Sequence, residues 1–157
     1  MKILKIWNKR DSNYSDILID DWNWDRVNEW NWCIIFPSGD IRIMRTNRPH
    51  IQLSNFIMND NKNIYDHISR DPLDNREENL RICTIQQNSF NRGVKATNKS
   101  GYIGVSWDKT AKKWVAQIEY CGKGTKIGRF NDKIEAAKAR DAKALELFGD
   151  FAVLNFS

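Results

Sequence analysis

Residues 65–88, YDHISRDPLDNREENLRICTIQQN, decide the fold and the chemistry expected of this chain. The run IYDHI at residues 64–68 predicts a strand, SRDPLDNREEN a loop, and residues 80–82 a second short strand. Thr84 followed by Gln87 has the pattern of a helix N-cap and its reciprocal partner. The stretch therefore predicts a strand–loop–strand–helix (ββα) unit.

Four polar residues occur at fixed intervals between the short apolar runs of this unit. They are Asp66, His67, Asn79 and Asn88, the last in the first turns of the predicted helix. A carboxylate, an imidazole and an amide gathered on one site can hold a divalent metal and activate a water. The pattern therefore indicates a metal-dependent phosphodiesterase.

Composition bounds the class of protein. The 157 residues suffice for one ordinary domain or two small ones, and 41% hydrophobic with 29% charged residues is typical of a soluble globular protein. No apolar run approaches the ~18 residues that a membrane helix needs, and the N-terminus lacks a secretory signal. We therefore expect a cytoplasmic protein with no membrane partner.

The cysteines argue against two kinds of site. There are three of them, an odd number, and no CxxC pair occurs. This excludes a disulfide framework and a cysteine-ligated zinc site as expectations, and predicts three reduced thiols.

Charge is unevenly distributed along the chain. Residues 1–50 carry +1, residues 51–92 carry −1 and residues 93–157 carry +5, which equals the whole excess. A surplus confined to one region favours a polyanion-binding face, and a merely solvated basic surface is the alternative. Beside a phosphodiesterase pattern, it suggests that the substrate is a nucleic acid.

The sequence outside the ββα unit divides into three regions. Residues 1–50 hold five of the seven tryptophans, which we expect to form a small core, with base stacking as the alternative. In this region CIIFPSGDIRIM predicts a hairpin. Residues 51–57 predict a short helix or strand beneath the site, and residues 93–100 a basic linker.

Residues 101–157 predict a three-stranded sheet covered by one helix. The strand-like runs are YIGVSW, KWVAQIEY and TKIGRF, and Trp107 and Trp114 are expected in the core. Asp132 with Glu135 predicts the helix start and Gly149 its end. The helix face expected to cover the sheet comprises Ile134, Ala137, Leu145 and Phe148. The class predicted for the whole chain is α+β, with domains at 1–50, 51–92 and 101–157 joined by the linker at 93–100.

The ββα unit resembles the HNH endonuclease family. The shared pattern is Asp66-His67, Asn79 in the REENLR segment and Asn88 four residues after Thr84, the variant with asparagine at the last position. LDNREENLR adds to the match. The resemblance implies one bound metal, DNA as substrate, and products with 5′-phosphate and 3′-hydroxyl ends.

The C-terminal region resembles the Apetala-two (ethylene-response-factor) DNA-binding domain. The likeness rests on Gly104-Val105, Trp114, Gly128 with Phe130, Glu135-Ala136-Ala137, Asp141, Gly149 and the ending Leu154-Asn155-Phe156. An HNH unit followed by such a module is similar to homing endonucleases of phages and mobile introns. Ile103, Ser106 and Glu119 stand where the plant domains use arginine, so the plant target sequence does not carry over.

The site residues receive roles on this basis. His67 is the candidate general base, because neutral imidazole accepts a proton near pH 7. Asp66 and Asn88 are the candidate ligands of Mg²⁺, with Mn²⁺ tolerated and no zinc. Asn79 is assigned to bracing the loop that carries His67. Asn75 remains a rival for that bracing role and Asn91 a rival for the ligand.

DNA contacts are expected from both regions. Near the site, arginines could clamp phosphates, and surface salt bridges with the neighbouring acids are an equal alternative. On the basic module, lysines would give sequence-independent affinity, while four sheet residues would reach base edges. The predicted set is Arg70, Arg76, Arg81, Arg92, Lys95, Lys99, Ser106, Lys109, Lys112, Lys113, Gln117, Glu119 and Lys126.

These expectations combine into one function. The sequence predicts a homing-type, metal-dependent endonuclease acting on double-stranded DNA as a monomer or weak dimer, without a small-molecule cofactor. The alternative is a non-catalytic DNA-binding regulator that keeps the HNH scaffold.

Overall fold

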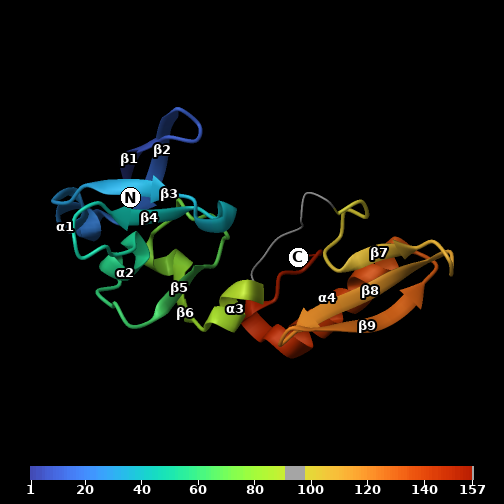
Figure 1. The fold of residues 1–157 in the computed structure, drawn as a ribbon. Helices are drawn as coiled ribbons and strands as arrows, with labels where there is room; N and C mark the ends of the chain where they lie inside the picture. Colours follow the sequence, from blue (N-terminus) through green and yellow to red (C-terminus); the bar gives the residue numbers. More distant parts are fainter. Residues whose placement is uncertain (91–97, 157) are drawn as a thin grey trace. The chain divides into compact units, whose positions relative to one another are not determined.

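The chain forms two compact units, residues 1–84 and 85–157, each described here by itself. The computed structural model describes residues 1–90 and 98–156, apart from the side chains of Ser38, Ser89 and Phe90. Within these ranges four small antiparallel sheets and a few helices confirm the predicted α+β class (Figure 1). Among the described helices, none has the length and apolar character needed to cross a bilayer.

The first unit begins with two hairpins. β1 (Lys2–Asn8) pairs with β2 (Asn13–Ile19), and β3 (Trp32–Ile35) pairs with β4 (Arg42–Arg45) as CIIFPSGDIRIM predicts. A 3-10 helix, η2 (Pro37–Gly39), makes the second turn. The short elements between and after the hairpins are η1 (Asp21–Asn23), α1 (Trp24–Asn28) and α2 (Leu53–Ile57).

One hydrophobic core runs through the whole first unit. It joins Ile6, Ile17 and Ile19 of the first hairpin to Leu53 of α2 and to further residues as far as Leu80. Apolar positions alternate along β1 and β2, so each strand buries one face. The regions 1–50 and 51–84, separated in the sequence analysis, thus share their buried apolar surface.

The prediction that the N-terminal tryptophans form the core is wrong for three of the five. Trp32 is buried and Trp24 packs against the core. Trp7, Trp22 and Trp30 are 48%, 69% and 37% exposed. Isoleucine, valine and leucine fill the interior instead, because the short hairpins present enough β-branched residues to it.

The predicted ββα order is present. β5 (Ile64–His67) pairs antiparallel with β6 (Leu80–Cys83), η3 (Glu77–Asn79) lies between them, and α3 (Ile85–Phe90) follows. The strands belong to the first unit, whereas α3 belongs to the second.

The second unit is built on a three-stranded sheet in the order β7-β8-β9. Its strands are β7 (Val105–Asp108), β8 (Lys113–Tyr120) and β9 (Lys123–Phe130), with a register shift between Ala116 and Gln117. α4 (Lys133–Phe148) packs against all three strands and is followed by η4 (Gly149–Phe151).

The ends of α4 follow the sequence signals. The Asp132 carboxylate accepts hydrogen bonds from the amides of Ile134 and Glu135, at 2.7 and 3.1 Å. Such a cap satisfies amides that have no partner inside the helix. Gly149 ends the helix at φ +53°, a left-handed value that glycine adopts without strain.

The covering face of α4 differs from the prediction. Ala137 and Phe148 are buried as expected, but Ile134 and Leu145 are 41% and 52% exposed. The helix approaches the sheet through small residues, with Ala116 of β8 fully buried beneath it. The buried positions of α4 are Ala136, Ala137, Arg140, Asp141, Ala144 and Phe148.

Trp107 also departs from its prediction. It is 46% exposed, whereas its cross-strand neighbour Trp114 packs against the sheet–helix core. The two rings form an edge-to-face pair with centroids 5.0 Å apart. Trp107 therefore covers one side of Trp114 and leaves its own outer side in water.

Candidate active site

Strand pairing places Asp66 opposite Arg81 at the centre of the candidate site. Asp66 is 5% exposed, and its Oδ2 accepts hydrogen bonds from Nε and an Nη of Arg81, at 3.0 and 2.8 Å. A buried carboxylate requires such a partner, because removal from water is costly for an isolated charge. Arg81 therefore provides the partner that the buried Asp66 carboxylate needs on β5.

His67 is the last residue of β5, adjacent to this ion pair. Its Nε2 lies 3.3 Å from Oδ1 of Asn75. An amide oxygen only accepts hydrogen bonds, so Nε2 carries the proton and Nδ1 is the unprotonated nitrogen of the neutral ring. Burial lowers the pKa of His67, and the hydrogen bond to Asn75 and the charge of Asp66 oppose the shift without cancelling it. The imidazole is therefore neutral at pH 7.

Asn79 braces the loop that follows His67. Its side-chain oxygen accepts the Ser69 amide at 2.8 Å, and its side-chain nitrogen donates to the Asp74 carbonyl at 2.7 Å. Its own carbonyl accepts the Ile68 amide at 2.9 Å. Asn79 is buried, so these bonds have no competition from water. Asn79 thus ties both ends of the loop.

Asn75 holds the middle of the same loop. It is 2% exposed, and its Nδ2 donates to the Pro72 carbonyl at 3.0 Å while its Oδ1 faces His67. The two asparagines therefore divide the bracing function for which the sequence left them as rivals: Asn79 fixes the loop, and Asn75 contacts the imidazole.

The N-terminal hairpin also fixes this loop, a contact that no local sequence pattern predicts. Leu18 of β2 accepts the Asn75 amide at 2.9 Å and donates its own amide to the Leu73 carbonyl at 2.8 Å. Two residues on, the Asp20 carboxylate accepts the Glu77 amide at 2.8 Å. The loop that positions His67 is therefore pinned to β2.

The three predicted phosphate-binding arginines near the site, Arg70, Arg76 and Arg81, differ in their partners. Arg76 bonds Asp74 in a bidentate manner, at 2.8 and 2.7 Å, and pairs with Glu78. Arg81 is committed to Asp66, and Arg70 is exposed at φ +66°. The salt-bridge alternative therefore holds for Arg76. Arg92 and Lys95 lie outside the described residues, as does the rival ligand Asn91.

The donors present fit a metal ion only if few protein atoms hold it. Asp66 offers carboxylate oxygen, the donor that Mg²⁺ prefers. In the described part of the chain, no three acidic, histidine or cysteine side chains gather as a metal cluster. Asn88, the second predicted ligand, is exposed on α3 in the second unit. Water and phosphate oxygens would have to complete the coordination.

Three of the four predicted base readers of the second unit lie together on one face of its sheet, here called the strand face. Ser106, Gln117 and Lys126 line one hollow together with Asp108, Val115, Gly124 and Thr125. Gln117 and Lys126 are direct cross-strand partners. Glu119 is exposed further along β8 and does not line the hollow.

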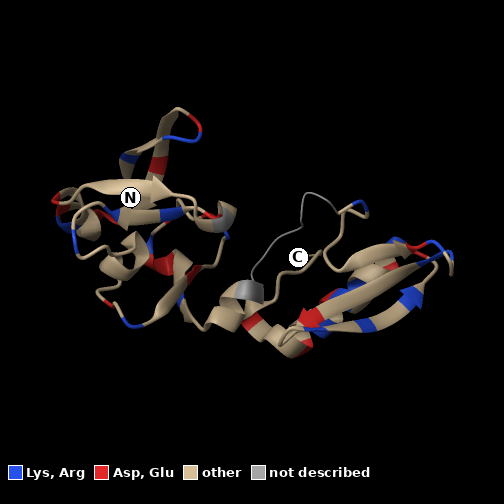
Figure 2. Cartoon of the chain, viewed as in Figure 1, with Lys and Arg blue, Asp and Glu red and all other residues tan. Residues whose placement is uncertain are grey.

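Lysines surround that face. Figure 2 shows basic positions along β9 and near the turns of the sheet. The other predicted phosphate contacts described by the structure are all exposed: Lys99, Lys109, Lys112 and Lys113.

The Asp66–Arg81 pair is the main feature that sequence reasoning missed. Arg81 was expected to bind phosphate or to pair with the loop acids. Its position follows from the register of β5 and β6, in which His67 faces Leu80 and Asp66 therefore faces Arg81. Antiparallel pairing of the two predicted strands was the available signal.

Comparison with known proteins finds two relatives. Over 87 residues the chain is 33% identical to "Protein 3.8" of Escherichia phage T7, a match covering 55% of the chain and 71% of that protein. Over 90 residues it is 36% identical to a protein of Acanthamoeba polyphaga mimivirus named as an uncharacterized HNH endonuclease. This match covers 57% of the chain but only 46% of the mimivirus protein. No family model matches the sequence. The extent and identity of the first match show that the chain belongs to the family of Protein 3.8 of phage T7.

Proposed function

We propose that this protein is a metal-dependent DNA endonuclease of the HNH type, built for homing-type cleavage of double-stranded DNA. It hydrolyses a phosphodiester bond to leave 5′-phosphate and 3′-hydroxyl ends. The observation that carries the proposal is the neutral His67 beside the buried Asp66, on a loop fixed by Asn75 and Asn79. The relative named as an HNH endonuclease supports the same class.

His67 acts as the general base. The contact between Nε2 and Asn75 orients the ring, and the neutral imidazole takes a proton from the attacking water. A lowered pKa keeps the base form populated at neutral pH. Asn75 and Asn79 are positioning residues, because they act through the imidazole and its loop.

Asp66 and Asn88 are the proposed ligands of a Mg²⁺ ion, which Mn²⁺ can replace. The assignment of Asn88 rests on the sequence pattern alone. Such an ion supplies stabilisation of the negative charge that develops on the phosphate and on the leaving 3′ oxygen. The ion pair with Arg81 fixes the position of the Asp66 carboxylate on β5 for that role.

The second unit supplies affinity for the duplex. Its strand face carries Gln117 and Lys126 side by side, with Ser106 in the same hollow. A β-sheet face fits the major groove, and the surrounding lysines neutralise phosphates. The Apetala-type mode of binding is part of this proposal.

The test follows supercoiled plasmid incubated with Mg²⁺ or with EDTA. Wild-type protein with Mg²⁺ is expected to give open-circular and then linear DNA. The EDTA sample and the His67→Ala variant are expected to stay supercoiled. End-labelling of the products should show 5′-phosphates. Wild type that binds plasmid but cuts neither plasmid nor candidate target DNA with Mg²⁺ or Mn²⁺ would refute the enzyme.

One observation favours a second candidate, a non-catalytic DNA-binding regulator. Arg81 already satisfies Asp66 without a metal, as expected of a purely structural ion pair. In that case metal ions leave DNA binding and the thermal stability of the protein unchanged, and every variant of His67 behaves as wild type.

A further inference from the structure

The distal part of the β1–β2 hairpin exposes an aromatic pair that the core does not use. Trp7 and Tyr14 face each other across the strands and are 48% and 58% exposed. Their rings make an edge-to-face contact with centroids 5.3 Å apart. Ile3, 45% exposed, lies on the same outward face of β1. Lys5 lies between Ile3 and Trp7 on that face, so the exposed apolar area beside the turn is that of the two rings.

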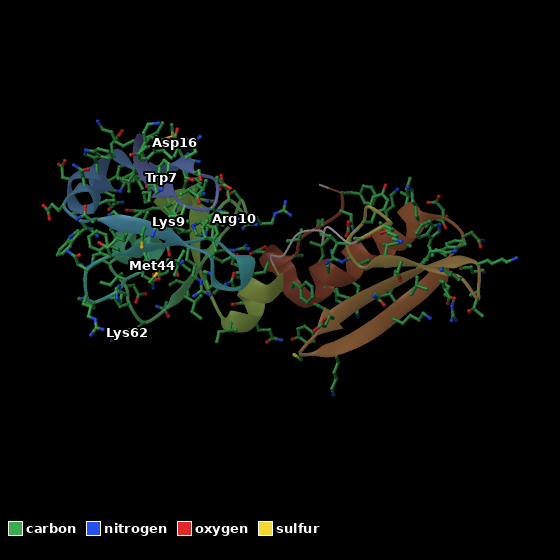
Figure 3. All side chains as sticks on the ribbon, turned by 45° about the horizontal axis from the view of Figure 1, so that its top comes forward. Trp7, Lys9, Arg10, Asp16, Met44 and Lys62 are labelled. Carbon is green, nitrogen blue, oxygen red and sulfur yellow. The ribbon has the colours of Figure 1, made fainter. Side chains whose placement is uncertain are left out.

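Two cationic side chains follow this aromatic pair in the hairpin turn. Lys9 and Arg10, both exposed, form the turn beyond it (Figure 3). Residues 2–19 contain four lysines and arginines against two aspartates, whereas the rest of the first unit has eight against eleven. The hairpin is therefore a positive element on a unit that is otherwise negative.

The two acids of the hairpin are already engaged. Asp16 accepts a hydrogen bond from Nζ of Lys5 at 2.9 Å, and Asp11 accepts one from the side chain of Asn8 at 2.7 Å. Arg10 lies over the Phe36 ring with its guanidinium carbon 5.4 Å from the centroid, which holds the charge at the hairpin turn. The turn after β1 therefore holds two cationic side chains, Lys9 and Arg10, against one acid, Asp11.

A purely structural role for the pair accounts for less than is seen. A cross-strand aromatic pair stabilises a hairpin, and this one does so. Stabilisation alone gives no reason for the flanking cations or for two large rings about half in water. Aromatic faces beside lysine and arginine are the combination with which proteins contact nucleic acid, because bases stack on rings while cations pair with phosphates.

The base of the same hairpin is hydrogen-bonded to the loop that follows His67. Leu18 of β2 exchanges backbone hydrogen bonds with Leu73 and Asn75, and Asn75 contacts His67. A contact made at the hairpin tip is therefore fixed in position relative to the imidazole through one compact unit.

We propose that the β1–β2 hairpin is a second DNA-contacting element, with Trp7 and Tyr14 packing on the duplex and Lys9 and Arg10 pairing with its phosphates. A two-stranded β-ribbon is a shape that the major groove admits. The inference rests on the proposed function for the identity of the partner. It adds that the nuclease unit itself holds the DNA.

The test measures the dissociation constant for a fluorescent 30-base-pair duplex, in EDTA so that no cleavage occurs. Trp7→Val combined with Tyr14→Val removes both rings and keeps residues that favour strands. Affinity is expected to fall about tenfold. Trp7→Phe with Tyr14→Phe should recover most of it, because the aromatic faces remain. Trp22→Ala is the matched control, since it removes an exposed indole outside the hairpin, and it should stay within about twofold of wild type.

Four readouts separate the outcomes: melting temperature, duplex affinity, light scattering and cleavage. If the valine pair melts at the wild-type temperature and binds duplex as tightly as wild type, the hairpin inference is overturned, whatever the cleavage assay shows. If wild-type protein self-associates in light scattering and the valine pair does not, the surface binds a second copy of the chain. That outcome also overturns the inference. If the valine pair binds more weakly while wild-type protein never cuts DNA, the hairpin inference stands and the enzyme proposal fails. If the valine pair does not fold, Lys9→Ala with Arg10→Ala at the exposed turn replaces it, and unchanged affinity there overturns the inference.

Discussion

The two units of this protein differ in the balance and in the burial of their charged side chains. The first contains 12 lysines and arginines against 13 acids, and the second 13 against 7. The first unit buries Asp66, Asp74, Asn75 and Asn79 around a histidine, whereas the second exposes its lysines on a sheet. Both units bury polar groups, so burial alone does not identify a reactive site.

The buried polar cluster of the second unit makes the contrast clear. Arg140 and Asp141 of α4 pair with each other, and the Asp141 carboxylate also bonds Asn155, whose side chain bonds the backbone of Ile103. These bonds tie the C-terminal segment to the start of the sheet. In the first unit the comparable network of hydrogen bonds, made by Asn79 and Asn75, includes the imidazole of His67. A titratable ring at the end of a fixed network is what general base catalysis requires. In our proposal the general base therefore lies in the first unit, and the second unit supplies most of the affinity.

The largest expected effect is the loss of chemistry in His67→Ala. Single-turnover cleavage should fall about 10²–10⁴-fold, the range that general base catalysis contributes. Duplex affinity and melting temperature should stay close to wild type, because the side chain lies at the end of the network. His50→Ala, which removes an exposed imidazole that contacts the Arg45 carbonyl, is the control. Equal cleavage by both variants would remove His67 from the mechanism.

Removal of Arg81 should damage both stability and cleavage. Arg81→Met keeps the apolar stem but leaves Asp66 as a buried charge without its partner. We expect about 2–4 kcal/mol lower free energy of unfolding, measured in urea near pH 7. The double variant with Asp66→Asn should recover part of that stability and remain inactive. An unchanged stability of the single variant would mean that the ion pair contributes nothing.

Asn79→Ala should lower the free energy of unfolding by about 1–3 kcal/mol, because two buried backbone groups lose their partner. Cleavage should fall as well, through the loosened His67 loop. Asn47→Ala, at an exposed position, is the matched control and should be nearly neutral. Hydrogen exchange at the Ser69 amide reports the loop directly. Protection there equal to wild type would contradict the bracing role.

The pH dependence of cleavage should reflect the buried environment of His67. Rate should rise as the imidazole loses its proton, and the midpoint should lie below the ordinary value near 6.5, because burial lowers the pKa of His67. The hydrogen bond to Asn75 raises that pKa, so Asn75→Ala should move the midpoint further down and Asn75→Asp should move it up. A midpoint above 6.5 in the wild type would exclude this environment for the catalytic base.

The smallest effect is expected on the sheet of the second unit. Lys126→Ala should weaken duplex binding a few-fold and lower the slope of log affinity against log salt by about one. Lys143→Ala, on α4 and paired with Glu146, should leave that slope unchanged. Titrations at several salt concentrations decide between them. Equal slopes in the two variants would mean that the lysines on the strand face are ordinary solvated charges.

Local patterns in the sequence predicted most of the elements. The strand pair around the loop, the three strands of the second sheet and the Asp132 cap all rest on signals within a few residues. The predictions that failed concern contacts between residues that are far apart in the sequence. The prediction of the buried face of α4 was wrong because the helix packs on the sheet through small residues such as Ala136 and Ala144. The exposure of Trp7 on β1 and of Trp22 in η1 follows from how these short elements pack, which no local pattern encodes.

The candidate site was predictable in composition but not in bonding. The spacing of Asp66, His67 and Asn79 singled out the residues. It could not indicate that Arg81 pairs with Asp66, or that Leu18, 57 residues before Asn75, bonds the loop. Such pairings arise from strand register and tertiary packing.

The division of labour between the units is tested most directly by measuring cleavage rate and duplex affinity on the same preparations. The proteins are wild type, His67→Ala, and a variant with Ser106, Gln117 and Lys126 replaced by alanine. Single-turnover rates are taken with Mg²⁺ at saturating protein, and dissociation constants in EDTA. The account predicts that His67→Ala loses rate and keeps affinity, while the triple variant loses affinity and keeps its rate once saturated. A triple variant that binds normally, or a His67→Ala protein that still cuts, would contradict it.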